Sequence, residues 1–128
     1  MADAAAAAEA SALFVDESYE EALAMYSKAV QLNDTNASHY LQRAATHLKL
    51  ESFTDALVDA NRAIELDPSN PKGYLRKGVA CFSLEEYDTA KQAFEHGNKL
   101  EPTKAFATWI RKCEVEIADE EEEEEEEE

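Results

Sequence analysis

The chain has 128 residues, about the length of one domain, and its 45% apolar content, three glycines and three prolines suit a helical protein with short connections. Its net charge of −17 is uneven, because residues 119–128 are ten consecutive acidic residues and the other residues carry a net charge of −7. This excess of acid argues against nucleic-acid binding, which needs clustered Lys and Arg, and no apolar run approaches the roughly 20 residues of a membrane span.

Cys81 and Cys113 are too few for a disulfide framework, and reduced thiols in a cytoplasmic and nuclear protein are the simpler interpretation. The N-terminus carries Asp3 and Glu9 but no early Lys or Arg, which argues against a signal or transit peptide.

The sequence repeats with a period of 34 residues over three units, 3–36, 37–70 and 71–104. Residues of one kind recur at equivalent positions, namely Ala10, Ala44 and Gly78; Tyr19, Phe53 and Tyr87; Ala22, Ala56 and Ala90; and Leu32, Leu66 and Leu100. A fixed period of this length predicts a solenoid, in which each unit buries its apolar face against its neighbours. Such a fold presents a surface to a partner and rarely carries chemistry.

Each unit is predicted to form two antiparallel helices. In the first unit the opening helix is Ala-rich, with only Leu13 and Phe14 as large apolar groups, so we expect it to fray or to pack loosely. The second and third units have apolar stripes with helical spacing on both helices. Pro68 and Pro71 separate these two units, since proline disfavours helix at the preceding residue and fits the first turn of the next helix.

After Pro102, residues 105–118 form an amphipathic stretch that predicts a capping helix. Its apolar face consists of Phe106, Trp109, Ile110, Cys113 and Ile117. Residues 119–128 follow as a self-repelling acidic block, which we expect to be a disordered linker or tail.

Enzymatic interpretations find little support. The three histidines, His39, His47 and His96, show no metal-ligand spacing with the cysteines, and there is no Gly-rich phosphate loop or nucleophile elbow. His47 is expected to be a packed interior histidine, and the carboxylates of the turns and second helices are expected to be solvated (Asp55, Asp59, Glu85 and Glu86). We therefore predict no catalytic, metal-binding or cofactor-binding residues.

The repeated positions resemble the tetratricopeptide repeat. The resemblance rests on Tyr40 and Tyr74 in the first helices, a small residue four positions later, an aromatic residue that opens the second helix, and a closing proline. Ala6 and Asp34 depart from this pattern in the first unit. The resemblance implies an all-α, right-handed solenoid of three helix-turn-helix repeats with a C-terminal capping helix, over residues 3–118.

A narrower resemblance is to the N-terminal domain of the plant co-chaperone adaptor family called suppressor of G-two allele of Skp-one, on the segments LFVDESYEEALAMYSKAVQLN and DALVDANRAIELDPSNPKGYLRKG. It implies an adaptor in ubiquitin-ligase assembly and disease-resistance signalling, whose partners are a ubiquitin-ligase subunit, chaperones or immune-receptor complexes. It also implies that further domains follow in a longer protein. The alternatives are a generic co-chaperone domain that binds the C-terminal peptide of a heat-shock chaperone and, more distantly, the non-catalytic repeat domain of an enzyme.

The first helices of a solenoid of this kind line its concave face, and helical spacing predicts a groove that includes Ser11, Gln42, Lys49, Lys72 and Arg76. Many tetratricopeptide co-chaperones hold a chaperone's terminal carboxylate with Lys, Asn and Arg. Lys72 and Arg76 match the third-unit cations of that clamp, whereas Gln42 replaces its second-unit Asn, and Ala7 and Ser11 replace its first-unit Lys and Asn. This half clamp favours another acidic segment over tight binding of a chaperone tail, and the alternative is that both cations are solvated.

Cys113 on the capping helix is expected to be partly exposed, which leaves open a redox-sensitive contact or a homodimer, with a packed free thiol as the alternative.

Overall fold

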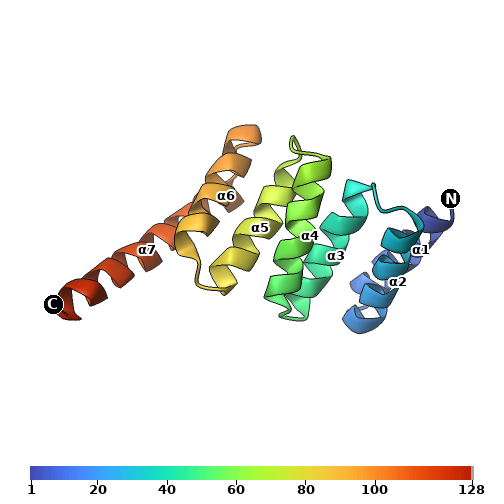
Figure 1. Ribbon diagram of the computed structural model, residues 1–128, viewed down its shortest axis with the longest axis horizontal. Helices are drawn as coiled ribbons and strands as arrows, with labels where there is room; N and C mark the ends of the chain where they lie inside the picture. Colours follow the sequence, from blue (N-terminus) through green and yellow to red (C-terminus); the bar gives the residue numbers. More distant parts are fainter. Residues whose placement is uncertain (128) are drawn as a thin grey trace.

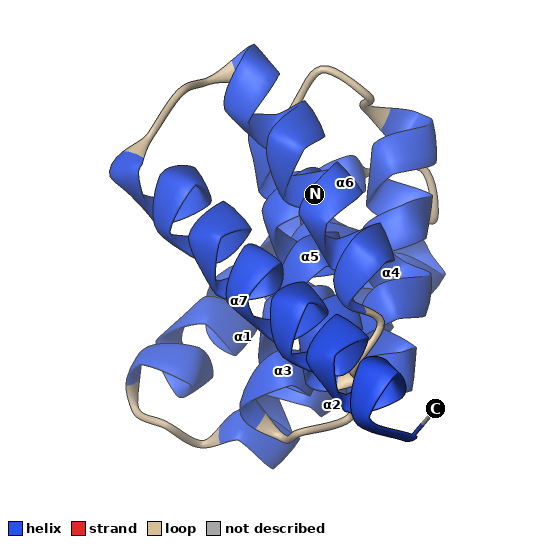
Figure 2. Cartoon of the chain, turned by 90° about the vertical axis from the view of Figure 1, so that its left-hand side faces the viewer, coloured by secondary structure: helices blue, strands red, loops and turns tan. Residues whose placement is uncertain are grey.

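The structure, a computed structural model, describes residues 1–127 and contains seven helices connected by short turns, with no strand among the described residues (Figures 1 and 2). The helices are α1 (Ala2–Val15), α2 (Tyr19–Leu32), α3 (Ala37–Lys49), α4 (Phe53–Leu66), α5 (Pro71–Ser83), α6 (Tyr87–Leu100) and α7 (Lys104–Glu127). The first six form three consecutive hairpins, and α7 packs against α6 at the end of the row farthest from the N-terminus (Figure 1). The predicted all-α repeat fold is confirmed.

The same hydrogen bonds start equivalent helices 34 residues apart. The Asn36 side chain accepts a bond from the Ser38 N–H at 2.9 Å, and Asn70 accepts one from the Lys72 N–H at 3.0 Å. These bonds satisfy backbone donors that have no partner inside the helix. In the same way, the Tyr40 hydroxyl donates to the Asp34 carbonyl at 2.8 Å, and Tyr74 donates to the Pro68 carbonyl at 2.9 Å, which ties each helix to the loop before it.

The turn inside each hairpin also recurs with the period of 34. Glu17, Glu51 and Glu85 take left-handed backbone conformations, with φ of 63°, 59° and 63°. The residue after each one donates a hydrogen bond five residues back, as from Ser52 to the His47 carbonyl at 2.8 Å. This pattern ends a helix and reverses the chain, and it is most often built with glycine at the left-handed position.

Helix α1 does not fray, contrary to expectation. It begins at Ala2, and Ala6 and Ala10 are buried. The Asp3 carboxylate is bound by Nε2 of His39 at 2.9 Å and by the Asn33 amide at 3.2 Å, which fixes α1 to the second hairpin. The alanines that appeared too small to pack instead let α1 approach α2 closely, since Ala10 and Ala22 are both fully buried.

The C-terminal block also differs from the prediction. Helix α7 continues through residues 119–127, so these residues are helical where a disordered tail was expected, and Glu128 lies outside the described residues. Glutamate has a high helix propensity, and no Gly or Pro follows Pro102 to end the helix. These nine residues are exposed.

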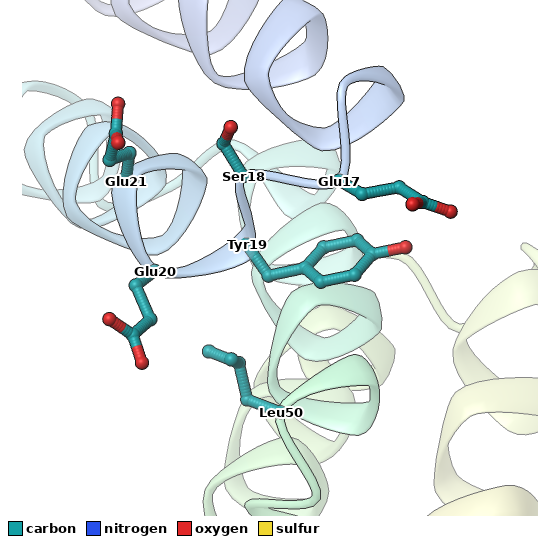
Figure 3. Close-up of a pocket in the computed structure, with 6 residues that line it drawn as sticks. All are labelled: Glu17, Ser18, Tyr19, Glu20, Glu21 and Leu50. Carbon is teal, nitrogen blue, oxygen red and sulfur yellow. The ribbon is translucent and has the colours of Figure 1, made fainter.

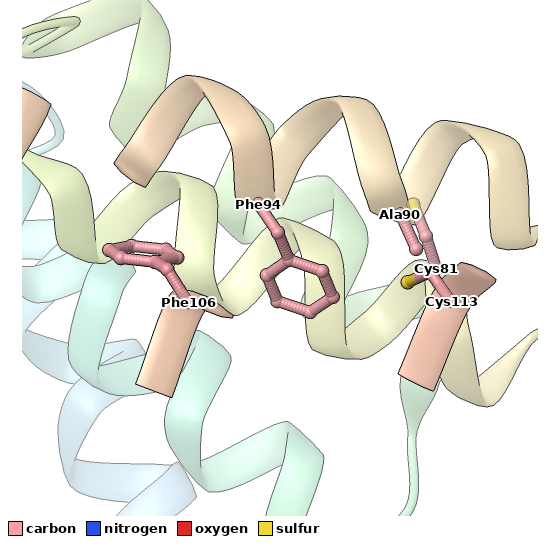
Figure 4. Packing of buried hydrophobic residues seen from close by; sticks show 5 residues of the cluster. All are labelled: Cys81, Ala90, Phe94, Phe106 and Cys113. Carbon is pink, nitrogen blue, oxygen red and sulfur yellow. The ribbon is translucent and has the colours of Figure 1, made fainter. Parts of the chain in front are cut away.

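The capping helix is held by the largest buried cluster, which consists of Cys81, Ala90, Phe94, Phe106 and Cys113 (Figure 4). Trp109 stacks on Phe94 with ring centroids 5.2 Å apart, and a Cβ at Gly78 would overlap the Phe94 ring. Helices α5, α6 and α7 therefore form one packed unit, which positions the third-unit residues of the groove.

Candidate functional site

Residues of three first helices meet in a cavity of about 350 Å³, which we call the groove pocket. It is lined by Phe14 of α1, by Ala45, Leu48 and Lys49 of α3, and by Arg76 and Val79 of α5. Its walls are thus mostly apolar, with two cationic side chains. Such a cavity suits a chain segment that carries both an apolar side chain and a carboxylate.

Arg76 is the unusual group in this pocket. Its side chain is largely withdrawn from water, and its Nε atom is buried without a hydrogen-bond partner. Arg76 forms no ion pair with any residue of 1–127, and burial lowers the pKa of its guanidinium. Because a guanidinium stays protonated in proteins, the structure holds a partly desolvated cation without a counter-charge. An anion in the groove pocket would relieve that cost.

A second cavity of about 300 Å³, the polar pocket, lies where α3 and α5 begin. It is lined by Asn36, Ala37, Ser38, Leu41, Gln42, Asp67, Asn70 and Lys72. Lys72 therefore shares its pocket with the Asp67 carboxylate. Because this carboxylate is negative, the polar pocket attracts an anion less strongly than Lys72 alone would.

The predicted groove residues thus do not all line one cavity. Lys49 and Arg76 line the groove pocket, and Gln42 and Lys72 line the polar pocket. Ser11 is exposed on α1 and lines neither cavity, so the first unit contributes only the Phe14 ring to the groove pocket.

A buried ion pair escaped prediction. Asp59 was expected to be solvated, but it is only 3% exposed, and Arg43 binds its two oxygens at 2.7 Å each. His47 is half-buried, as expected for a packed histidine, and its Nε2 lies 3.6 Å from the same carboxylate. The hydrogen bonds to Asp59 raise the pKa of Arg43. This pair joins α3 to α4 and orients the helix that carries Lys49.

A cavity of about 330 Å³ at the α1–α2 turn is rich in acid but carries no site. It is lined by Glu17, Ser18, Tyr19, Glu20, Glu21 and Leu50. Figure 3 shows its three carboxylates pointing in different directions. Among residues 1–127, no group of three His, Cys, Asp or Glu residues could hold a metal ion.

Cys113 is not exposed, contrary to the expectation that it offers a redox or dimer contact. It is fully buried beside Cys81 in the cluster under the capping helix (Figure 4). Burial raises the pKa of its thiol to about 11 and also raises the pKa of Cys81. Both thiols are therefore protonated and shielded from solvent, as packed free thiols are.

Within residues 1–127, no helix combines the length and the apolar content that a bilayer crossing requires.

Comparison with known proteins supports the repeat. The family model described as tetratricopeptide repeat matches residues 71–104. No curated protein sequence matches the chain. Among solved structures, the chain is 32% identical to the TPR domain of Arabidopsis OM64, with a TM-score of 0.86 over 88% of this chain and 93% of that one.

Two further structures contain peptides. The first TPR of Spaghetti (RPAP3), bound to the HSP90 peptide SRMEEVD, is 28% identical to this chain, with a TM-score of 0.90 over 91% of this chain and 94% of that one. The second TPR domain of human RPAP3, in complex with the HSP70 peptide SGPTIEEVD, is 30% identical, with a TM-score of 0.82 over 88% and 98% of the two chains.

Proposed function

The chain belongs to the tetratricopeptide repeat family, and from that premise we propose that it is a protein-interaction domain without catalytic activity. Its groove pocket binds an acidic segment of a partner protein, and the C-terminal peptides of heat-shock chaperones are the leading candidates. We further propose that the protein acts as a co-chaperone in the cytoplasm and nucleus.

The observation that carries the proposal is the unpaired Arg76. Its buried Nε makes no hydrogen bond in the structure, and the Lys49 side chain adds a second cation to the same pocket. A charge-assisted hydrogen bond contributes about 1.5–3 kcal/mol, and a carboxylate at Arg76 would also remove the penalty of the unsatisfied donor. An acidic side chain or a chain terminus is therefore the ligand group that this pocket favours.

The peptide-bound relatives support the chaperone candidates. Both peptides, SRMEEVD and SGPTIEEVD, end in the same four residues, of which three are acidic. The groove pocket offers such a sequence two cations among apolar walls.

A second candidate is the adaptor role implied by the resemblance to the plant co-chaperone family. In this role the groove binds an internal acidic segment of a ubiquitin-ligase subunit or an immune-receptor complex. A homodimer of the chain is a further assembly to test. The observation in its favour is the charge distribution: Ser11 lines neither the groove pocket nor the polar pocket, Ala7 is uncharged, and Asp67 lines the polar pocket together with Lys72. A chain that ends in Asp brings two carboxylates, one on the side chain and one at the terminus, and this pair gains less from such a groove than from one with a full set of cations.

Isothermal titration with SGPTIEEVD and SRMEEVD, each as free acid and as C-terminal amide, tests both candidates. We expect the free acids to bind with dissociation constants on the order of 1–100 μM. Binding that weakens at least about tenfold on amidation supports chaperone tails. Equal binding of acid and amide supports an internal acidic segment and the adaptor role. If neither peptide binds in either form, the proposed acidic-peptide groove is wrong.

A further inference from the structure

The last part of α7, which we call the acidic arm (residues 115–127), projects from the end of the row of hairpins (Figure 1). Helix α7 has 24 residues and α5 has 13, so α7 is longer by about 16 Å. All residues of 118–127 are exposed, and residues 119–127 are all acidic. No ion pair among residues 1–127 includes a residue of the arm. The arm is thus a helix of carboxylates whose mutual repulsion a cation from outside would relieve.

Helix α7 runs parallel to α5, as its buried contacts show. Phe106 of α7 and Tyr74 of α5 both border Gly97 of α6. Farther along the two helices, Cys113 of α7 lies in one buried cluster with Cys81 of α5 (Figure 4). The arm therefore continues in the direction in which α5 ends.

This direction takes the arm away from the groove pocket of its own chain. Arg76 precedes Cys81 by five residues, whereas Asp119 follows Cys113 by six. At a rise of about 1.5 Å per helical residue, Arg76 and Asp119 are about 16 Å apart along the helix axes alone. The acidic arm and the groove pocket can therefore meet only if they belong to different copies of the chain.

The acidic arm carries the groups that the groove pocket favours. The pocket has apolar walls and two cations, and the Nε atom of Arg76 is buried without a hydrogen-bond partner. On the arm, Val115 is 53% exposed, and Asp119 and Glu122 follow it on the same helix face, four and seven residues later. An exposed apolar side chain thus stands next to carboxylates at the spacing with which helices bind in grooves.

We propose that the groove pocket binds the acidic arm of a second copy, with Val115 against the apolar walls and carboxylates of the arm on Arg76 and Lys49. This inference rests on the proposed function, because the arm takes the place of the partner peptide. A groove filled in this way is closed to the peptide. The arm therefore inhibits peptide binding by competition, and by mass action it does so more strongly as the protein concentration rises.

The first test is a competition between two variants that each keep one half of the contact. The acceptor keeps its groove but has a neutral arm, with Asp119→Asn and glutamine in place of glutamates 120–128, since glutamine keeps a high helix propensity. The competitor is Arg76→Glu, which keeps its acidic arm. The control competitor combines Arg76→Glu with the neutral arm, so the two competitors differ only in the arm.

The readout is the anisotropy of fluorescent SGPTIEEVD bound to the acceptor. We expect the Arg76→Glu competitor to displace half of the peptide at about 0.1–1 mM, and the control to displace less than about a tenth at the same concentration. Equal displacement by the two competitors, or displacement by neither, overturns the contact between arm and groove.

Sedimentation equilibrium of the parent chain gives a second measurement, which does not depend on a substitution in the groove. We expect the parent chain to self-associate and to dissociate when SGPTIEEVD saturates the groove, while the acceptor with the neutral arm stays a monomer. Association that persists in either condition overturns the proposal, because the copies then pair through another face.

The results also separate this inference from the proposed function. If the acceptor binds SGPTIEEVD but the two competitors do not differ, the contact between arm and groove is wrong and the peptide groove stands. If neither the parent chain nor the acceptor binds SGPTIEEVD, the peptide groove is wrong and the inference that rests on it is wrong too.

Discussion

The carboxylate of Asp3 lies 2.9 Å from Nε2 of His39, a residue of the second hairpin that is only 4% exposed. This contact joins the first turn of α1 to the start of α3, and the Asn33 amide adds a second bond to the same carboxylate. It explains why an alanine-rich helix stays in register and holds Phe14 at the groove pocket.

Replacing Asp3 by Asn should make the stability of the domain less dependent on pH in acid. The His39 bond, followed by the N-terminal ammonium and Asn33, holds the pKa of Asp3 well below its usual range. A lowered carboxyl pKa contributes stability above the unfolded value of about 3.9, and this contribution is lost as the pH falls toward the folded pKa. Urea unfolding should show Asp3→Asn less stable than the parent at pH 7, with a difference that shrinks below pH 4. A difference that stays constant with pH would rule out this linkage.

Removing the buried carboxylate of Asp59 should destabilise the domain by about 3 kcal/mol, near the lower end of the effect of breaking a buried ion pair. The lower end applies because the Arg43 side chain keeps 22% of its exposure. Chemical denaturation of Asp59→Ala measures the loss. The double variant Arg43→Met/Asp59→Leu should recover most of it, since no buried charge is then left unpaired. A loss below about 0.5 kcal/mol in Asp59→Ala would mean that the pair is solvated, as the sequence suggested.

The hairpins could be predicted from the periodicity because, in each helix, apolar residues at helical spacing mark the face that is buried. The Arg43–Asp59 pair and the Asp3–His39 contact could not be read in this way. Each joins residues 16 or 36 positions apart, and their burial depends on how two helices cross. Alanine is equally ambiguous in a sequence. It occurs both in helices that bury little apolar surface and at positions where two helices approach each other closely.

Glycine at position 51 should stabilise the domain by about 0.5–1 kcal/mol, because it removes the cost of a side chain in the left-handed region. Glu51 has a φ of 59° there, and its side chain is exposed. Thermal or urea unfolding of Glu51→Gly checks the gain. The control Glu51→Ala keeps a Cβ and should show none, so an equal gain in both variants would refute the backbone explanation.

The two cysteines should react slowly with iodoacetamide in the folded protein. With its pKa raised to about 11, Cys113 has a thiolate fraction of about one in a thousand at pH 8, and its side chain is fully buried. We expect labelling of both thiols only after denaturation, followed by mass spectrometry. Rapid labelling of Cys113 in the native chain would contradict this account and would support the exposed, redox-active thiol that the sequence suggested.

For the candidate site, the residue types were predictable but their grouping was not. Helical spacing placed Lys72 and Arg76 on one face, yet they line different pockets, because Asn36 and Asn70 shape the wall beside Lys72 while Leu48 and Phe14 surround Arg76. The burial of the Arg76 Nε atom depends on these neighbours, and no pattern in the sequence indicates it. The helical continuation of α7 through residues 119–127, by contrast, agrees with the high helix propensity of glutamate and with the lack of Gly or Pro after Pro102.

The most direct test of the groove is the affinity of Arg76→Glu for fluorescent SGPTIEEVD, measured by anisotropy beside the control Lys77→Glu. Lys77 carries the same charge on the same helix but lines neither the groove pocket nor the polar pocket. We expect about 100-fold weaker binding for Arg76→Glu with an unchanged circular dichroism spectrum, and at most about a twofold change for Lys77→Glu. Parent-like binding by Arg76→Glu would contradict the central claim that this buried cation receives an acidic partner.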